Sequence, residues 1–420
     1  LAGSDQNHHG ARLRGGARQR RAEHVTPRLR TGYQLALLSG LWGCASAPPP
    51  SPSPAPSPAA PVAPTASPST PSAATPVPSM PAPSPAPATA PSVKKPPPPE
   101  PLPPDGLSRG TGEPADLALA QGDKAYDAES YKDARAHYRK AEQLAPKDPA
   151  PKVGLVRVSV AEADLPLDYA SAPRDPRIAP LLKQLDAALK LDPEFGPALL
   201  ERGHLLLIQG KAEQAKGSLE RAAQLMPRHA EAQSAVGVGL LAVGKSSEAL
   251  PYFERSSTLD RDNPDRLGNL GAAYLIVGRV ADAVAAFERA ASLAPNSARY
   301  QSDLGTAYLA QNRFDRALPA LKRAVELDAT RASYLANLSY AYQANADYER
   351  AVSTAELATR LDPKLGSAWL NLGTARAKRG ELDQAEAAFK RALGLDPEDP
   401  RAKANLEELA ELRRKKTAAP

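Results

Sequence analysis

Apolar and polar residues follow the period of an amphipathic helix along Pro264–Ser297, in two runs separated by Gly278. In the first run, Leu267 and Leu270 begin a series whose spacing places side chains on one face of a helix. Gly278 supplies the turn between the runs, and Pro295 ends the second one. This segment therefore predicts two helices joined by a short turn.

The same segment recurs with a period of 34 residues. The positions that end successive second helices are Pro193, Pro227, Arg261, Pro295, Ala329, Pro363 and Pro397. A small residue, which lets two helices approach closely, stands at the eighth position in Gly122, Gly203, Gly237, Gly271, Gly305, Ser339 and Gly373, whereas the second repeat has Val156. Helix pairs that repeat at this length stack side by side into an α-solenoid.

The repeated positions resemble those of the tetratricopeptide repeat family. The residues that show the pattern most fully are Trp369, Leu372, Gly373, Ala385, Phe389, Ala392 and Pro397. The resemblance covers residues 115–399 and implies an all-α fold, a right-handed solenoid of about eight repeats within 114–399. The family is defined by its packing residues, so the resemblance implies binding of a protein or peptide partner without naming it.

The second repeat is longer than the others, and its excess falls in residues 161–176. This spacing predicts a first helix near 150–160 and a second near 178–191. Insertions in solenoids map to loops on one face, so this loop is either a contact for a partner or a neutral surface loop.

A further helix is predicted after the last repeat, over residues 400–416. It carries Leu406, Leu409 and Leu412 on one face. Repeat arrays need a polar terminal cap, and we expect this helix to cover the apolar end of the last repeat.

The segment before the repeats has a different composition, since residues 44–113 are dominated by Pro, Ala and Ser. Such a sequence has too few large apolar residues to fold, and its prolines favour an extended chain. We expect a disordered Pro-rich tether that reaches on the order of 150 Å. A docking site for proline-reading domains is the alternative.

A short apolar run, residues 33–42, lies directly before Gly43 and Cys44. It is too short to span a membrane as a mature helix, and the arginines ahead of it are typical of a signal peptide. The residues around Cys44 resemble the lipobox of bacterial lipoproteins. The resemblance implies a signal peptide at 25–43, acylation of Cys44, and an outer-membrane lipoprotein anchored by its acyl chains and facing the periplasm. The alternative is a lone cysteine in a cytosolic protein.

Residues 1–24 are interpreted as an over-extension of the reading frame ahead of a true start at Val25, or as a disordered basic leader. The formal charge of +6 comes from the two ends of the chain, because residues 1–43 and Arg413–Lys416 are strongly basic. The repeats themselves show no basic excess, so we expect no nucleic-acid partner.

The repeats contain no pattern of catalytic or metal-binding residues. His137, His204 and His229 lie on separate repeats, without the spacing of metal ligands or a neighbouring nucleophile. We interpret them as surface or packing histidines. We therefore expect no enzymatic activity, no cofactor, no metal and no small-molecule substrate.

The candidate binding residues lie on the first helices, whose positions 2, 6, 9 and 13 are expected to form a concave wall away from the packing stripe. Position six carries Asn269, Asp303, Asn337 and Asn371. This series resembles the asparagine ladder of tetratricopeptide proteins that hold an extended peptide by its backbone. Position twelve carries Leu241, Leu275 and Leu309, which form either an apolar groove for a partner or core packing between repeats.

These features predict a non-catalytic, envelope-anchored scaffold that binds proteins or peptides in its concave groove. The resemblance to envelope-assembly lipoproteins with such repeats implies a role in building a secretion, pilus or cell-wall complex. A soluble cytoplasmic adaptor or regulator is the alternative function.

Overall fold

The computed structural model describes residues 106–163 and 175–418, with side chains to Arg414. Outside the described residues lie the leader at 1–24, the expected signal peptide, the expected lipidation site Cys44, residues 44–105 of the expected Pro-rich tether and most of the insertion at 161–176. The expectation that the disordered tether extends to residue 113 is wrong, because Leu107 is buried and its N–H donates to Asp123 Oδ2 at 2.7 Å. Within the described ranges the chain is all-α. Its helices are α2 (Pro114–Asp127), α3 (Tyr131–Leu144), α4 (Ala150–Ala163), α5 (Ile178–Leu191), α6 (Gly196–Ile208), α7 (Ala212–Leu225), α8 (Ala230–Ala242), α9 (Ser246–Leu259), α10 (Pro264–Ile276), α11 (Val280–Leu293), α12 (Ala298–Ala310), α13 (Phe314–Leu327), α14 (Ala332–Ala344), α15 (Tyr348–Leu361), α16 (Gly366–Lys378), α17 (Leu382–Leu395) and α18 (Pro400–Ala418).

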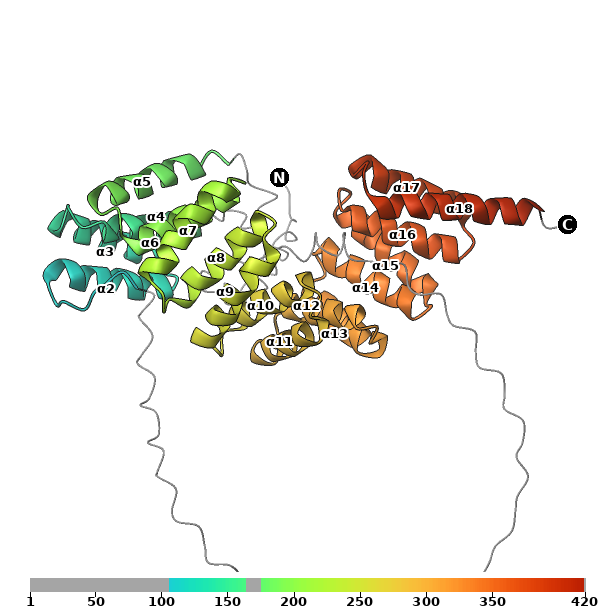
Figure 1. The fold of residues 1–420 in the computed structure, drawn as a ribbon, viewed down its shortest axis with the longest axis horizontal. Coiled ribbons are helices and arrows are strands. Elements are labelled where there is room, and N and C mark those ends of the chain that lie inside the picture. The colour runs from blue at the N-terminus through green and yellow to red at the C-terminus, as the bar shows by residue number, and fades with distance from the viewer. Residues whose placement is uncertain (1–105, 164–174, 419–420) are drawn as a thin grey trace, which may run out of the picture. The chain divides into compact units, whose positions relative to one another are not determined.

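Consecutive helices form pairs, from α2 with α3 to α16 with α17, and each pair is one tetratricopeptide-like repeat (Figure 1). The second helix of each pair also packs against the first helix of the next pair. In most neighbouring repeats the two first helices touch each other as well. We call the surface made by the first helices, α4 to α18 in even numbers, the first-helix face.

Glycine at the eighth position lets the two helices of a repeat meet, as the sequence predicts. A Cβ atom at Gly271 would lie 2.8 Å from the ring of Phe287 on the partner helix. In the repeat that has Ser339 instead, the buried hydroxyl donates to the carbonyl oxygen of Ala351 at 2.8 Å. Gly278 adopts a positive φ of 79°, which favours glycine in the turn between the helices.

The second repeat contains both predicted helices, α4 and α5, on either side of the insertion. Its eighth residue, Val156, is fully buried. The close approach is made at Gly154 instead, where a Cβ atom would lie 2.6 Å from the ring of Tyr138. Tyr138 thus packs against glycines of two first helices, Gly122 in its own repeat and Gly154 in the next.

The predicted terminal helix is α18, and it packs on α17 through Ala402, Leu406 and Leu409. The expectation that Leu412 shares this face is wrong, because its side chain is 41% exposed. At that end of α18, Arg413 pairs with carboxylates of α17, so the contact is ionic. No helix in the described part of the chain has the length and apolar character needed to cross a membrane.

Candidate binding surface on the first helices

The position-six residues lie on α10, α12, α14 and α16, and their asparagines bind the preceding repeat. Asn269 donates to the Ser234 hydroxyl at 3.1 Å, Asn337 to the Ser302 hydroxyl at 3.4 Å, and Asn371 to the Ala336 carbonyl oxygen at 2.8 Å. In each case the partner stands 35 residues earlier, one repeat plus one residue. The premise that this stripe does not pack is therefore wrong for Asn269, which is 1% exposed because Ser234 of α8 and Arg299 of α12 both bind its side chain. It is also wrong for Asp303, which is 9% exposed.

A second contact between first helices joins position nine to position six of the next repeat. Asn337 also donates to the Thr306 hydroxyl at 3.2 Å, and Asn405 donates to the Thr374 hydroxyl at 3.5 Å, each across 31 residues. We call the surface of α14, α16 and α18 that carries Asn337, Asn371 and Asn405 the amide part of the first-helix face. Its contacts between repeats use neutral groups.

Asp303 is the exception in the row. Its carboxylate has no N–H to donate, and the residue 35 positions earlier is Gly268, which has no hydroxyl. Among the described residues, no donor forms a hydrogen bond with its Oδ2 atom, and the Arg299 Nε atom lies 3.6 Å away. Burial raises the pKa of Asp303 to about 6, and the positive charge of Arg299 only partly opposes this rise.

The position-twelve leucines belong to the core. Leu309 is 4% exposed, and Leu241 and Leu275 are partly buried against neighbouring core residues. This placement favours the packing interpretation of the series over an apolar groove.

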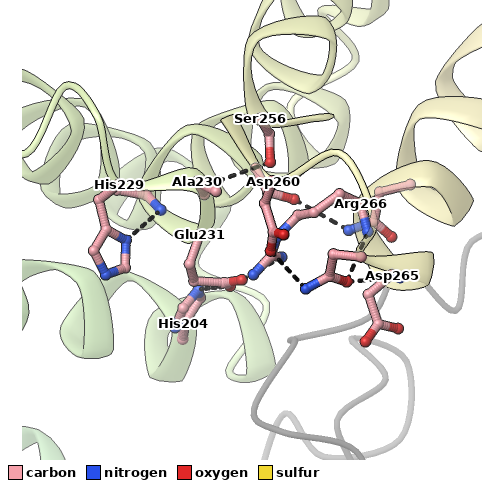
Figure 2. Close-up of polar contacts among 12 residues, drawn as sticks. His204, His229, Ala230, Glu231, Ser256, Asp260, Asp265 and Arg266 are labelled. Atoms are coloured by element: carbon pink, nitrogen blue, oxygen red, sulfur yellow. Dashed lines mark hydrogen bonds and ion pairs between the residues drawn. The ribbon is translucent and has the colours of Figure 1, made fainter. Parts of the chain in front are cut away.

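The first helices α4, α6, α8 and α10 carry a chain of buried charges. Arg157 Nε lies 2.7 Å from Glu201 Oε1, and His204 lies 3.8 Å from Glu201 and 3.3 Å from Glu231. Arg266 pairs with the other oxygen of Glu231, so that this carboxylate lies between His204 and Arg266 (Figure 2). We call these five residues the charged part of the first-helix face.

The ionisation of this chain is set by its alternating signs. Burial opposes the charge of Glu201, but the neighbouring Arg157 and His204 outweigh it and lower the pKa of Glu201 to about 2. Burial likewise disfavours a charged His204, yet the carboxylates of Glu201 and Glu231 raise the pKa of its imidazole. Each charge is thus balanced by a neighbour from another first helix or another turn.

Arg299 lies on α12, between the charged part and the amide part, and its guanidinium interacts with several acceptors. Its guanidinium lies 3.2 Å from Asp265 Oδ1, and it donates to Asn269 Oδ1 at 3.5 Å. The Tyr300 hydroxyl also donates to Asp265, at 2.6 Å. The guanidinium of Arg299 is therefore shared among Asp265, Asn269 and Asp303.

Sequence reasoning missed the charged part, since it interpreted His204 as a surface or packing histidine. The signal that was present is a pair of opposite charges at facing positions of successive first helices, Glu231 and Arg266. His229 fits the structural interpretation, because its ring nitrogen accepts a hydrogen bond from the Ala232 N–H at the start of α8. His137 is partly exposed on α3.

No group of histidine, cysteine or acidic side chains in the described ranges has the arrangement of a metal site. The first-helix face presents carboxylates, amides and hydroxyls that bind other groups by charge and hydrogen bonding. This arrangement is suited to recognition of a polypeptide.

Three models of the tetratricopeptide repeat family match residues 266–330, 302–364 and 366–399. Among solved structures, the chain is similar to that of the APC/C hetero-tetramer Cut9-Hcn1, with a TM-score of 0.55, 15% identity and coverage of 72% of this chain. This chain spans 57% of the length of the Cut9-Hcn1 chain that it matches.

The chain is also similar to TTC0263, a protein of Thermus thermophilus (22% identity, 43% of this chain and 98% of that chain, TM-score 0.39). A third similar structure is pilF of Pseudomonas aeruginosa (20% identity, 51% of this chain and 97% of that chain, TM-score 0.44). No curated protein matches the sequence. The matching family models, the similarity to the Cut9-Hcn1 chain and the stacked helix pairs show that the described helices form a solenoid of tetratricopeptide repeats.

Proposed function

Because this chain carries tetratricopeptide repeats stacked into an all-α solenoid, we propose that it is an envelope-anchored scaffold that holds a partner protein on its first-helix face. Such repeats bind protein or peptide partners. The proposal adds the place of binding, the anchor and a role in assembling a secretion, pilus or cell-wall complex.

The observation that carries the proposal is the amide part of the first-helix face. Asn337 and Asn371 are only partly buried, and each holds the preceding repeat with its side-chain N–H while its carbonyl oxygen remains as an acceptor. An extended peptide presents backbone N–H groups that suit such acceptors whatever its side chains are. A row of such acceptors can bind the backbone of a partner peptide, and this binding requires no catalytic group.

The anchor is proposed from the sequence around Cys44, where a basic and apolar run precedes the only cysteine of the chain. Acylation at this residue would hold the solenoid at a membrane through the Pro-rich tether, since each buried CH₂ contributes about 0.8 kcal/mol. The mass of the intact protein purified from membranes tests the anchor. An unmodified chain that starts before Cys44 and fractionates with the cytoplasm would favour the soluble adaptor instead.

Binding is tested by crosslinking the protein in the envelope, isolating the partner and measuring its affinity for purified variants. We expect the double variant Asn337→Ala/Asn371→Ala to weaken binding by about tenfold, since each lost hydrogen bond is worth about 0.5–1.5 kcal/mol. Asn269 is left in place because it is buried and supports the fold. The control is Asn345→Ala, on an exposed residue that follows α14. Equal affinity of the double variant and the parent would show that the amide part is not the binding surface.

A further inference from the structure

The position-six row offers hydrogen-bond acceptors and hardly any donors. The Asn371 amide must direct its N–H₂ group to the Ala336 carbonyl oxygen, which only accepts, so its own oxygen faces away from that bond. Asn337 donates its side-chain N–H groups to the hydroxyls of Ser302 and Thr306. No described residue donates to the side-chain oxygen of either asparagine.

Asp303 adds a charged acceptor to this row. It is 9% exposed, and its Oδ2 atom receives no hydrogen bond from the described residues. Arg299 lies nearer to Asp265, at 3.2 Å, than to Asp303, at 3.6 Å, and also binds Asn269. One guanidinium is thus shared by two carboxylates, and the charge of Asp303 is only partly balanced.

We propose that Asp303 is a specificity site that binds a lysine or arginine side chain of an extended peptide, whose backbone N–H groups bind the oxygens of Asn337 and Asn371. This inference rests on the proposed function and adds the chemistry of the partner. The oxygens of the row accept, and the second N–H of Asn371 is the one donor left on the asparagines that bind the peptide, so the partner must donate at each oxygen. At Asp303, the one position of the row that carries a net charge, a cationic side chain provides this donor.

The geometry of the array sets the spacing of the motif. Neighbouring packed helices lie about 8–10 Å apart, and an extended chain advances about 3.3 Å per residue. Successive positions of the row therefore correspond to about three residues of the peptide. The basic residue at Asp303 is followed at about three and six residues by the segments that bind Asn337 and Asn371. The peptide motif therefore needs only one basic residue, and the residues around it can be neutral.

The test measures binding of fluorescent peptide pools to the full chain by anisotropy. Each pool is made of acetylated 15-residue peptides with Lys, Arg, norleucine or Glu fixed at the centre and random uncharged residues elsewhere, so that the segments about three and six residues from the centre are present. We expect the Lys and Arg pools to bind about tenfold more tightly than the norleucine pool, and the Glu pool to bind most weakly. Acetylation removes the terminal amine, so the preference reports the side chain.

The matched variant is Asp303→Asn, which keeps the shape and provides an N–H for the Gly268 carbonyl oxygen, as Asn371 does for Ala336. We expect its preference for Lys over norleucine to fall below about twofold, with its affinity for the norleucine pool unchanged. Asp282→Asn, on an exposed residue of α11, should keep the parent preference. An undiminished preference in Asp303→Asn would overturn the proposal.

A pH series on the parent chain tests the same site without a variant. The pKa of Asp303 is about 6, so lowering the pH from 7.5 to 5.5 protonates the carboxylate while lysine stays charged. The preference for Lys over norleucine should therefore decline through pH 6, and a constant preference would contradict Asp303 as the cation site. Equal binding of all pools would overturn this inference and leave the proposed function standing. Binding of no pool would overturn both.

Discussion

In both the charged part and the amide part of the first-helix face, polar contacts hold neighbouring first helices together, but the two parts use different groups. In the charged part, neighbouring first helices meet at positions two, three, six and nine, and in the amide part they meet at positions five, six and nine. The charged part uses Arg157, Glu201, His204, Glu231 and Arg266, whose charges alternate in sign along the chain of contacts. The amide part uses neutral hydrogen bonds, each of which stands alone. The charged part therefore holds a fixed arrangement, and the amide part keeps acceptors for a partner.

The largest difference between the two parts should appear on removal of one buried charge. Glu201→Gln takes away the carboxylate between Arg157 and His204, and removing one partner of a buried ion pair destabilises a protein by about 3–5 kcal/mol. Asn337→Ala, in the amide part, should reduce the free energy of unfolding by only about 0.5–1.5 kcal/mol. Urea denaturation at pH 7 measures both.

The exposed Glu349→Gln serves as the control for loss of a carboxylate, and should change stability by less than about 0.5 kcal/mol. Similar losses from Glu201→Gln and Asn337→Ala would show that the two parts do not differ in how tightly they hold the repeats.

An intermediate effect is expected in the core, which the two parts share. Gly271→Leu and Gly373→Leu place a side chain where a Cβ atom alone would approach Phe287 to 2.8 Å and Phe389 to 2.5 Å. Each should lower the free energy of unfolding by about 1–3 kcal/mol or more through overpacking. Gly394→Ala, which faces open space, should be neutral or stabilising by up to about 1 kcal/mol. If the two Leu variants differ strongly from each other, the contrast between the regions lies in the core and not on the face.

The smallest effect is a pH dependence that only the charged part should show. The pKa of His204 is raised in the folded state, so its favourable contribution is complete below the unfolded value of about 6.5 and declines as the pH rises through the folded value. The melting temperature of His204→Gln should therefore lie furthest below that of the parent near pH 5.5 and approach it toward pH 9. Asn371→Ala, which removes no titratable group, should differ from the parent by a constant amount. A constant difference for His204→Gln would mean that its imidazole carries no charge between the two glutamates.

The repeat register could be predicted from the sequence because the packing residues recur at one period. Gly271 and its equivalents meet a large side chain of their own repeat, so a single repeat contains both partners of that contact. The helices on either side of the insertion were predictable for the same reason. The approach at Gly154 was not, because it involves Tyr138 of the preceding repeat.

The polar contacts of the face could not be predicted from a helical wheel, which describes one helix at a time. Asn269 lies on the stripe expected to face a partner, but it is buried and binds Ser234 of the preceding first helix and Arg299 of the following one. Arg157 and Glu201 are 44 residues apart, since the insertion lies between them. Only the arrangement of successive first helices brings such residues together. The partner-binding role of the position-six row stays a prediction.

The offset of 35 residues between contacts, in an array whose period is 34, determines how this array can grow by duplication of a repeat. Duplicating the repeat that holds Asn337 would place the new amide beside the Ala336 carbonyl oxygen, a partner that every backbone supplies. Duplicating the repeat that holds Glu231 would place that carboxylate opposite Ala232 of the new copy and separate it from Arg266. The array can therefore be extended by copying in its C-terminal half, whereas the order of repeats in its N-terminal half is fixed by charge.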